Sequence, residues 1–248
     1  MQAWKLLRHS FVTLFGNFAI ALRLSAVLYA VQAIPNIYFL NFMFGVPEAE
    51  LELNSQFWIL GSFNMVILMI TGSWIAVAWH RFILWEETPS GYIPKFRGRR
   101  MMAYFGQSLL LGLFIGVLFA GLGMILMFQF GNLSETLTDI IFFGLISSLI
   151  GSVFFRFAAI LPAATLGDWL GWSGAWRATK GSLGSLVLVS LVLWAGLLWA
   201  DEHVTNLISG NLFLLALWSI PFEWVFLMIH VSILTTLYGH YVEKRELY

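Results

Sequence analysis

Long, uninterrupted apolar segments dominate this chain, and apolar and polar positions rarely alternate. A helix needs roughly 20 apolar residues to cross the hydrocarbon of a bilayer, and six segments approach or exceed that length. The pattern predicts transmembrane helices at about residues 18–44, 57–85, 104–130, 137–164, 183–200 and 212–238. Continuous hydrophobicity of this length favours helices over strands. We therefore expect residues 1–248 to form a single all-α integral membrane domain with six transmembrane helices.

The composition agrees with a membrane protein. The 248 residues are 60% hydrophobic and 10% charged, with a mean hydropathy of +0.84, whereas soluble domains carry about 25% charged residues. Thirteen basic and thirteen acidic residues balance, so no basic excess indicates nucleic acid as a partner. The chain has no cysteine, which excludes disulfides and thiolate metal sites.

Charged residues segregate between alternate loops. The loops after the first, third and fifth predicted helices contain acidic residues and neither Lys nor Arg: Glu48, Glu50, Glu52, Glu135, Asp139, Asp201 and Glu202. The tails and the other loops carry basic residues: Lys5, Arg8, Lys95, Arg97, Arg99, Arg100, Arg177, Lys180, Lys244 and Arg245. The positive-inside rule then predicts that both termini lie in the cytoplasm.

The sequence around the first, third and fifth predicted helices suggests a threefold repeat. Gly16, Gly106 and Gly181 occupy equivalent positions at the cytoplasmic ends of these helices, each after a short basic and aromatic segment: residues 4–11, 94–105 and 172–180. Such segments are typical of amphipathic helices that lie at the membrane interface. We expect three pseudo-repeated hairpins, each preceded by an interfacial helix; coincidence among few residue types is the alternative.

Two segments resemble a known kind of membrane protein. They are "SGAWRATKGSLGSL" at residues 173–186 and "FRFAAILPAATLGDWL" at residues 155–170. They are similar to uncharacterised multi-pass inner-membrane proteins of bacteria and, loosely, to the membrane domain of some glycerophosphodiester phosphodiesterases. The resemblance implies a location in the bacterial inner membrane. It does not imply catalysis, because the phosphodiesterase domain and its clustered acidic and histidine residues are absent from this sequence.

An acidic residue within the sixth predicted helix is the first candidate for function. Glu223 lies in "SIPFEWVFLMIH", two residues after Pro221, at a depth where an isolated charge is costly. The carboxyl group could be protonated, paired with a cation, or exposed to a water-filled cavity. Arg156 in the fourth predicted helix is the nearest candidate cation by depth. We expect a Glu223–Arg156 contact, which could be structural or functional.

The basic cytoplasmic face is the second candidate site. Arginine and lysine side chains suit lipid phosphate, and the residues in question are Arg81, Lys95, Arg97, Arg99, Arg100, Arg177 and Lys180. Topology alone also explains these charges. The five histidines lack metal-ligand spacing, so we expect neither a metal nor another cofactor.

No catalytic motif is evident, so the sequence favours a non-enzymatic protein with a scaffold, accessory or assembly role. A small transporter or channel with a polar path at Glu223 and Arg156 is one alternative. A phospholipid-binding protein that uses the basic face is the other. Membrane lipids and other membrane proteins are the expected partners. A water-filled cavity that reaches Glu223 would favour transport, whereas a dry, closely packed bundle would count against it.

Overall fold

The computed structural model describes residues 2–47, 54–130, 144–208 and 210–247, so the predicted acidic residues Glu48, Glu50, Glu52, Glu135 and Asp139 lie outside the described residues. All the secondary structure in the described part is helical. Its helices are α1 (Gln2–Gly16), α2 (Phe18–Gly45), α4 (Ser55–Trp85), α5 (Gly98–Phe130), α7 (Ser147–Phe157), α8 (Ile160–Leu166), α9 (Trp172–Ala178), α10 (Leu183–Ser190), the π-helical η2 (Leu191–Leu197), α11 (Leu198–Ile208), α12 (Leu212–Leu237) and the π-helical η3 (Tyr238–Val242).

Six helical segments of the described part are long and apolar enough to cross a membrane, which confirms the number predicted from the sequence. They are Phe18–Met43, Ser55–Trp85, Gly98–Ile125, Gly144–Leu166, Leu183–Ile208 and Phe213–Val242. The fifth extends beyond its predicted end at residue 200. Asp201 and Glu202 are therefore helical residues of α11 and not loop residues as predicted.

Local sequence signals explain where several helices begin and end. The side chain of Asn54 accepts a hydrogen bond from the backbone amide of Gln56 at the start of α4. Asn211 does the same for the first amides of α12, as expected of N-cap residues. At the other end of α4, Glu86 adopts a left-handed conformation with φ of 54°, and the helix stops there.

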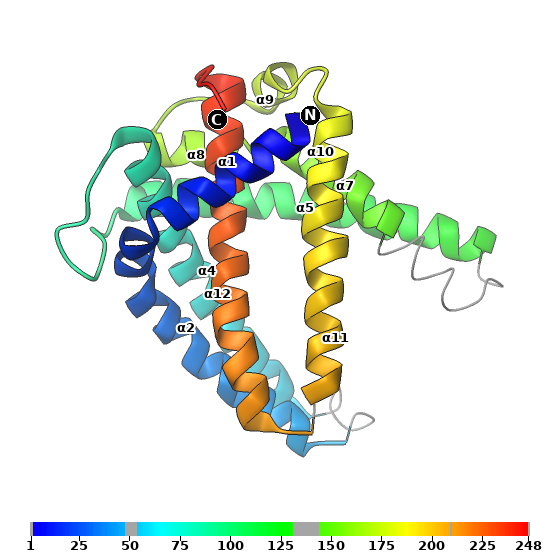
Figure 1. The fold of residues 1–248 in the computed structure, drawn as a ribbon. Coiled ribbons are helices and arrows are strands. Elements are labelled where there is room, and N and C mark those ends of the chain that lie inside the picture. The colour runs from blue at the N-terminus through cyan, green and yellow to red at the C-terminus, as the bar shows by residue number, and fades with distance from the viewer. Residues whose placement is uncertain (1, 48–53, 131–143, 209, 248) are drawn as a thin grey trace.

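Helix α1 packs against α12 and α10 at the end of the molecule where both termini lie (Figure 1). Leu6 and Leu14 on α1 are fully buried. Ser10 donates a hydrogen bond to the hydroxyl of Thr236 on α12 across 3.0 Å. Helix α1 therefore contributes buried apolar side chains to the core at this end. Helices α11 and α12 contact each other toward the opposite end.

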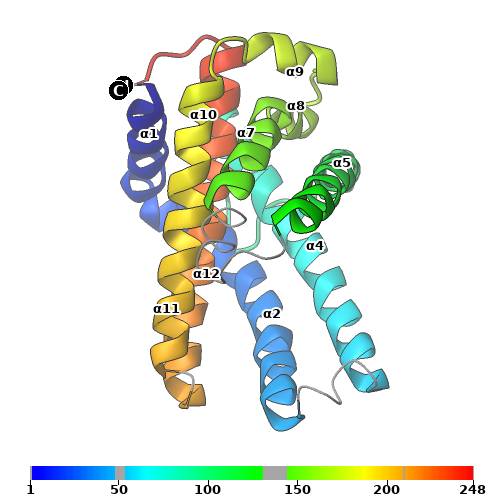
Figure 2. The same cartoon turned by 90° about the vertical axis from the view of Figure 1, so that its right-hand side faces the viewer.

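Helix α5 runs across the long axes of α10–α12, whereas α2 and α4 form a closely packed pair that slants away from them (Figures 1 and 2). Only 6% of the most apolar part of α5 is buried inside the protein, compared with 61% of the most apolar part of the span that contains α7 and α8.

The threefold repeat stays a prediction. Short helices precede α2 and α10, namely α1 and α9, in the positions where interfacial helices were expected. The second expected interfacial helix, at residues 94–105, is not a separate element, because α5 runs without a break from Gly98. Residues 98–105 are simply its first turns.

Candidate functional sites

Glu223 lies inside α12 and contacts polar side chains of two other helices. The side-chain amide of Asn36 on α2 lies 3.3 and 3.5 Å from the two carboxylate oxygens of Glu223. The carbonyl of Asn36 accepts a hydrogen bond of 3.0 Å from the side-chain amide of Asn64 on α4. These three residues form a polar chain across α4, α2 and α12, which we call the Glu223 network.

The three members of the Glu223 network lie at similar depth. Asn36 is nine residues before the end of α2 at Gly45, Asn64 is nine residues after Ser55, and Glu223 is eleven residues after Leu212. At about 1.5 Å per residue these positions lie roughly 14–16 Å from the helix ends. The network therefore lies deep within segments that are long enough to span a membrane.

A cavity of about 190 Å³ reaches Glu223 from between α2, α11 and α12. Asp201 of α11, Thr205 and Ser219 also line it. The carboxylate of Asp201 accepts a hydrogen bond of 2.8 Å from the indole of Trp218. The groups that face the Glu223 carboxyl are therefore Tyr29 and Asn36 from α2 and the acidic Asp201 from α11. Among the described residues no cation pairs with Glu223.

Further hydrogen bonds hold α2 against α12 beside this network. The hydroxyl of Tyr29 donates to the backbone carbonyl of Ile220 across 2.8 Å. The indole of Trp224 donates to the hydroxyl of Ser25, also across 2.8 Å. Both bonds flank Glu223 along α12, so the position of its carboxyl does not depend on the Asn36 contact alone.

The expected contact between Glu223 and Arg156 is wrong. The guanidinium of Arg156 donates to the carbonyl of Trp176 at 2.9 Å and lies over the indole of the same residue, 3.3 Å from the ring centroid. The hydroxyl of Thr179 accepts a longer bond of 3.4 Å. Arg156 lies in the last turn of α7, which packs against α9, whereas Glu223 lies midway along α12. The arginine is satisfied locally, so it is not the partner of the acid.

Two of the residues predicted to bind lipid headgroups, Arg81 and Arg97, belong to an ion cluster around Glu87. Glu87 accepts hydrogen bonds from Arg81, at 2.7 Å, and from Arg97. Arg81 is 8% exposed and also donates to the carbonyl of Thr165. Burial by itself would raise the pKa of the Glu87 carboxyl, but the hydrogen bonds and charges of Arg97 and Arg81 outweigh it and hold that pKa below its ordinary value. The cluster ties the loop after α4 to α4 itself and to the end of α8.

The other predicted headgroup residues have different surroundings. The guanidinium of Arg100 lies against Gly167, whose φ of +89° and lack of a side chain leave room for it. Four residues are exposed and could still meet lipid: Lys95, Arg99, Arg177 and Lys180. The structure therefore separates the predicted basic face into an ion-paired part and an exposed part.

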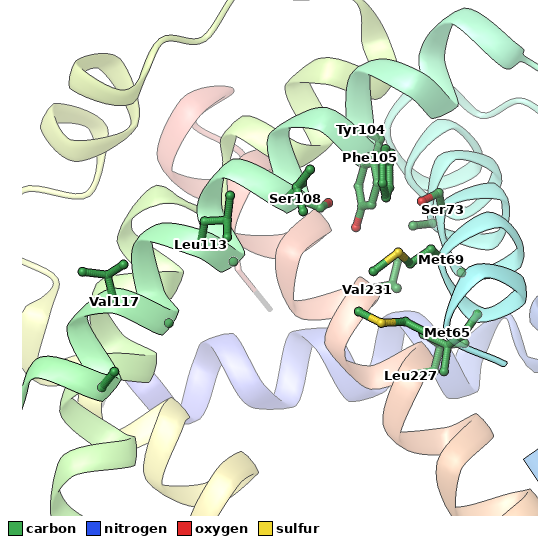
Figure 3. A pocket seen from close by; sticks show the side chains of 17 residues that line it. Met65, Met69, Ser73, Tyr104, Phe105, Ser108, Leu113, Val117, Leu227 and Val231 are labelled. Atoms are coloured by element: carbon green, nitrogen blue, oxygen red, sulfur yellow. The ribbon is translucent and has the colours of Figure 1, made fainter. Parts of the chain in front are cut away.

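A larger cavity, with a volume of about 650 Å³, lies elsewhere, between α4, α5 and α12. We call it the lateral cleft. Its walls are almost entirely apolar, and Figure 3 shows Met65, Met69, Leu227 and Val231 on the side of the cleft that faces α5. Sequence reasoning missed this feature, because the packing angle of α5 creates it and no local motif encodes that angle.

Comparison with protein-family models, with curated proteins and with solved structures gives no match for this chain. The resemblance to membrane domains of glycerophosphodiester phosphodiesterases therefore stays a prediction. What this chain does has to be argued from the Glu223 network, the ion cluster and the lateral cleft.

Proposed function

We propose that this chain is a small, non-enzymatic transport protein of the bacterial inner membrane, with both termini in the cytoplasm, in which Glu223 takes up and releases a proton. The observation that carries the proposal is a carboxyl group deep in a membrane-spanning helix, on the wall of a cavity, without a cation partner among the described residues. The ion pair with Arg156 would have explained Glu223 as a structural residue, and the contacts of Arg156 remove that explanation.

The surroundings of Glu223 suit both protonation states. The amide of Asn36 can donate to the ionised carboxylate, while the apolar membrane environment opposes its charge. Opposing influences of this kind allow a buried carboxyl group to change protonation state during a transport cycle. Asp201 and the hydroxyls of Thr205 and Ser219 line the same cavity and provide acceptors for water along a path to Glu223.

Proton flux into proteoliposomes tests the proposal. The purified chain is reconstituted with a pH-sensitive dye inside, and a potassium diffusion potential drives protons inward. We expect the wild-type protein to acidify the lumen faster than empty liposomes do, and Glu223→Gln to bring the rate back to that of empty liposomes. Glu202→Gln is the matched control, because Glu202 is exposed on α11 and should leave the rate unchanged.

Equal flux for the wild type and Glu223→Gln would contradict the proposal. So would flux no greater than that of empty liposomes. Either result would return the interpretation to the scaffold or accessory role that the absence of catalytic motifs first suggested, with the Glu223 network as a device that fixes the packing of α2, α4 and α12.

A further inference from the structure

The lateral cleft holds three hydroxyl groups in otherwise apolar walls. They belong to Ser73 on α4 and to Tyr104 and Ser108 on α5. Ser73 and Tyr104 are each only 8% exposed. The hydroxyl of Ser108 is buried and lacks a hydrogen-bond partner within the part of the chain that the structure describes. Figure 3 shows all three at the same end of the cleft, with their oxygens directed into it.

Buried hydroxyls without partners are costly, because they lose their hydrogen bonds to water without replacement. The hydrocarbon of a bilayer offers no water to replace those bonds. Three hydroxyls in one apolar cavity, of which that of Ser108 is buried without a partner, therefore indicate a ligand that brings its own hydrogen-bonding oxygen. An apolar cavity of several hundred Å³ with a few convergent polar groups is the usual form of a small-molecule site.

Small residues keep the cleft open. Gly72 on α4 and Gly112 and Gly116 on α5 line it, and a Cβ atom added at any of the three would meet no heavy atom within 4 Å. These glycines are therefore not explained by close packing between helices of this chain. They leave flat apolar walls along which an extended hydrocarbon chain could lie.

The lining also limits the charge of the ligand. No Lys, Arg, His, Asp or Glu lines the cleft, so a phosphate group would find no counter-ion there. His80 lies beside the ring of Tyr104 but does not line the cleft, and its Nδ1 forms a hydrogen bond of 2.8 Å with the hydroxyl of Thr235. The polar end of the ligand must be uncharged.

We propose that the lateral cleft binds an uncharged membrane lipid, with its apolar chain along α5 and a carbonyl or hydroxyl oxygen at Ser73, Tyr104 and Ser108. A neutral diacylglycerol and an isoprenoid quinone both carry this chemistry. The proposal goes beyond the proposed function and does not depend on proton transfer at Glu223.

Photo-crosslinking in nanodiscs tests the proposal. The probe is a diacylglycerol with a diazirine in one acyl chain, and cross-linked peptides are mapped by mass spectrometry. We expect labelling of the cleft residues on α4 and α5. Excess dioleoylglycerol or decylubiquinone should suppress it, and the stronger competitor identifies the preferred class, whereas dioleoylphosphatidylglycerol should not compete.

Two sets of variants make the test specific. Gly112→Leu and Gly116→Leu add side chains at positions that line the cleft and where an added Cβ meets no heavy atom, and we expect each to reduce labelling about tenfold. Gly121→Leu is the matched control, because Gly121 lies on α5 with equally open surroundings but does not line the cleft. In the double variant Ser73→Ala/Tyr104→Phe, the concentration of dioleoylglycerol needed to suppress labelling should rise ~10-fold. This is the change expected for the loss of one or two hydrogen bonds.

Three results would overturn the proposal. The first is equal competition by the anionic phospholipid, which would mean that the cleft holds bulk acyl chains without selection. The second is undiminished labelling in Gly112→Leu and Gly116→Leu. The third is cross-linking between α5 helices of two copies with no lipid adduct, which would assign the cleft to a partner helix.

Discussion

The side-chain amide of Asn36 on α2 lies within 3.5 Å of both carboxylate oxygens of Glu223 on α12. This contact joins two helices at matched depth and gives the acid a partner that carries no charge. An arginine partner would hold the carboxylate permanently ionised. An amide partner accommodates both protonation states, so the same contact can persist while a proton is gained and lost.

Replacing Glu223 with Gln should leave the fold intact. The glutamine side chain has nearly the same shape and keeps a carbonyl that can accept from Asn36, so we expect a change in the free energy of unfolding within about 0.5 kcal/mol. Glu223→Leu removes the acceptor and should destabilise the protein by about 1–3 kcal/mol. Thermal unfolding in detergent, followed by tryptophan fluorescence, measures both. A large loss of stability in Glu223→Gln would show that the charge itself holds the fold.

Arg156 should act independently of Glu223. Arg156→Gln loses the bond to the carbonyl of Trp176 and the stacking on its ring, so we expect a destabilisation of about 1–3 kcal/mol. In a double-mutant cycle with Glu223→Gln the coupling energy should lie below about 0.5 kcal/mol, as it does for distant sites. A coupling well above that value would restore the ion pair that the sequence suggested.

The ion cluster around Glu87 should make stability sensitive to acid. The pKa of Glu87 is lower in the folded protein than its ordinary value, so its carboxylate stabilises the fold above the unfolded pKa of about 4.3. That contribution is lost as pH falls through the folded pKa. We expect the Glu87→Gln variant to have a lower Tm than the wild type at pH 7. As the pH is lowered, the Tm of the variant should fall less than that of the wild type. Parallel Tm curves for the two proteins would contradict this role.

The proposed orientation can be tested with single cysteines, since the chain has none of its own. Lys180→Cys and Glu202→Cys introduce thiols at exposed positions toward opposite ends of the span Leu183–Ile208. A membrane-impermeant maleimide added to intact spheroplasts should label the cysteine at position 202. The cysteine at position 180 should be labelled only after the membrane has been permeabilised. The reverse pattern would place both termini outside the cytoplasm.

The sequence predicts the number and approximate positions of the spanning helices because burial in lipid requires continuous apolar runs of a defined length. It also identifies Glu223 as exceptional, because a carboxylate in such a run is costly wherever it lies. The partner of Glu223 was predicted wrongly, because the argument used charge and depth alone. Asn36 and Asn64 lie at matching depth in the first two spans, and that signal could have identified the network.

Other features depend on helix directions that local sequence does not encode. The sequence pairs Arg156 with Glu223 by its depth in the fourth predicted helix, but α7 ends beside α9 and the guanidinium of Arg156 contacts Trp176. The lateral cleft exists because α5 crosses the other helices at a steep angle (Figure 1). Hydropathy fixes the length of α5 but not its tilt, which depends on packing against its neighbours.

The most direct test of the central claim is to observe protonation of Glu223 itself. Infrared difference spectra of the protein in nanodiscs, recorded across a pH titration, report the carbonyl band of a protonated carboxyl group. We predict a band that grows as pH falls, is absent in Glu223→Gln and persists in Glu202→Gln. Spectra for which Glu223→Gln matches the wild type at every pH would show that Glu223 does not exchange a proton, and would contradict its role in transport.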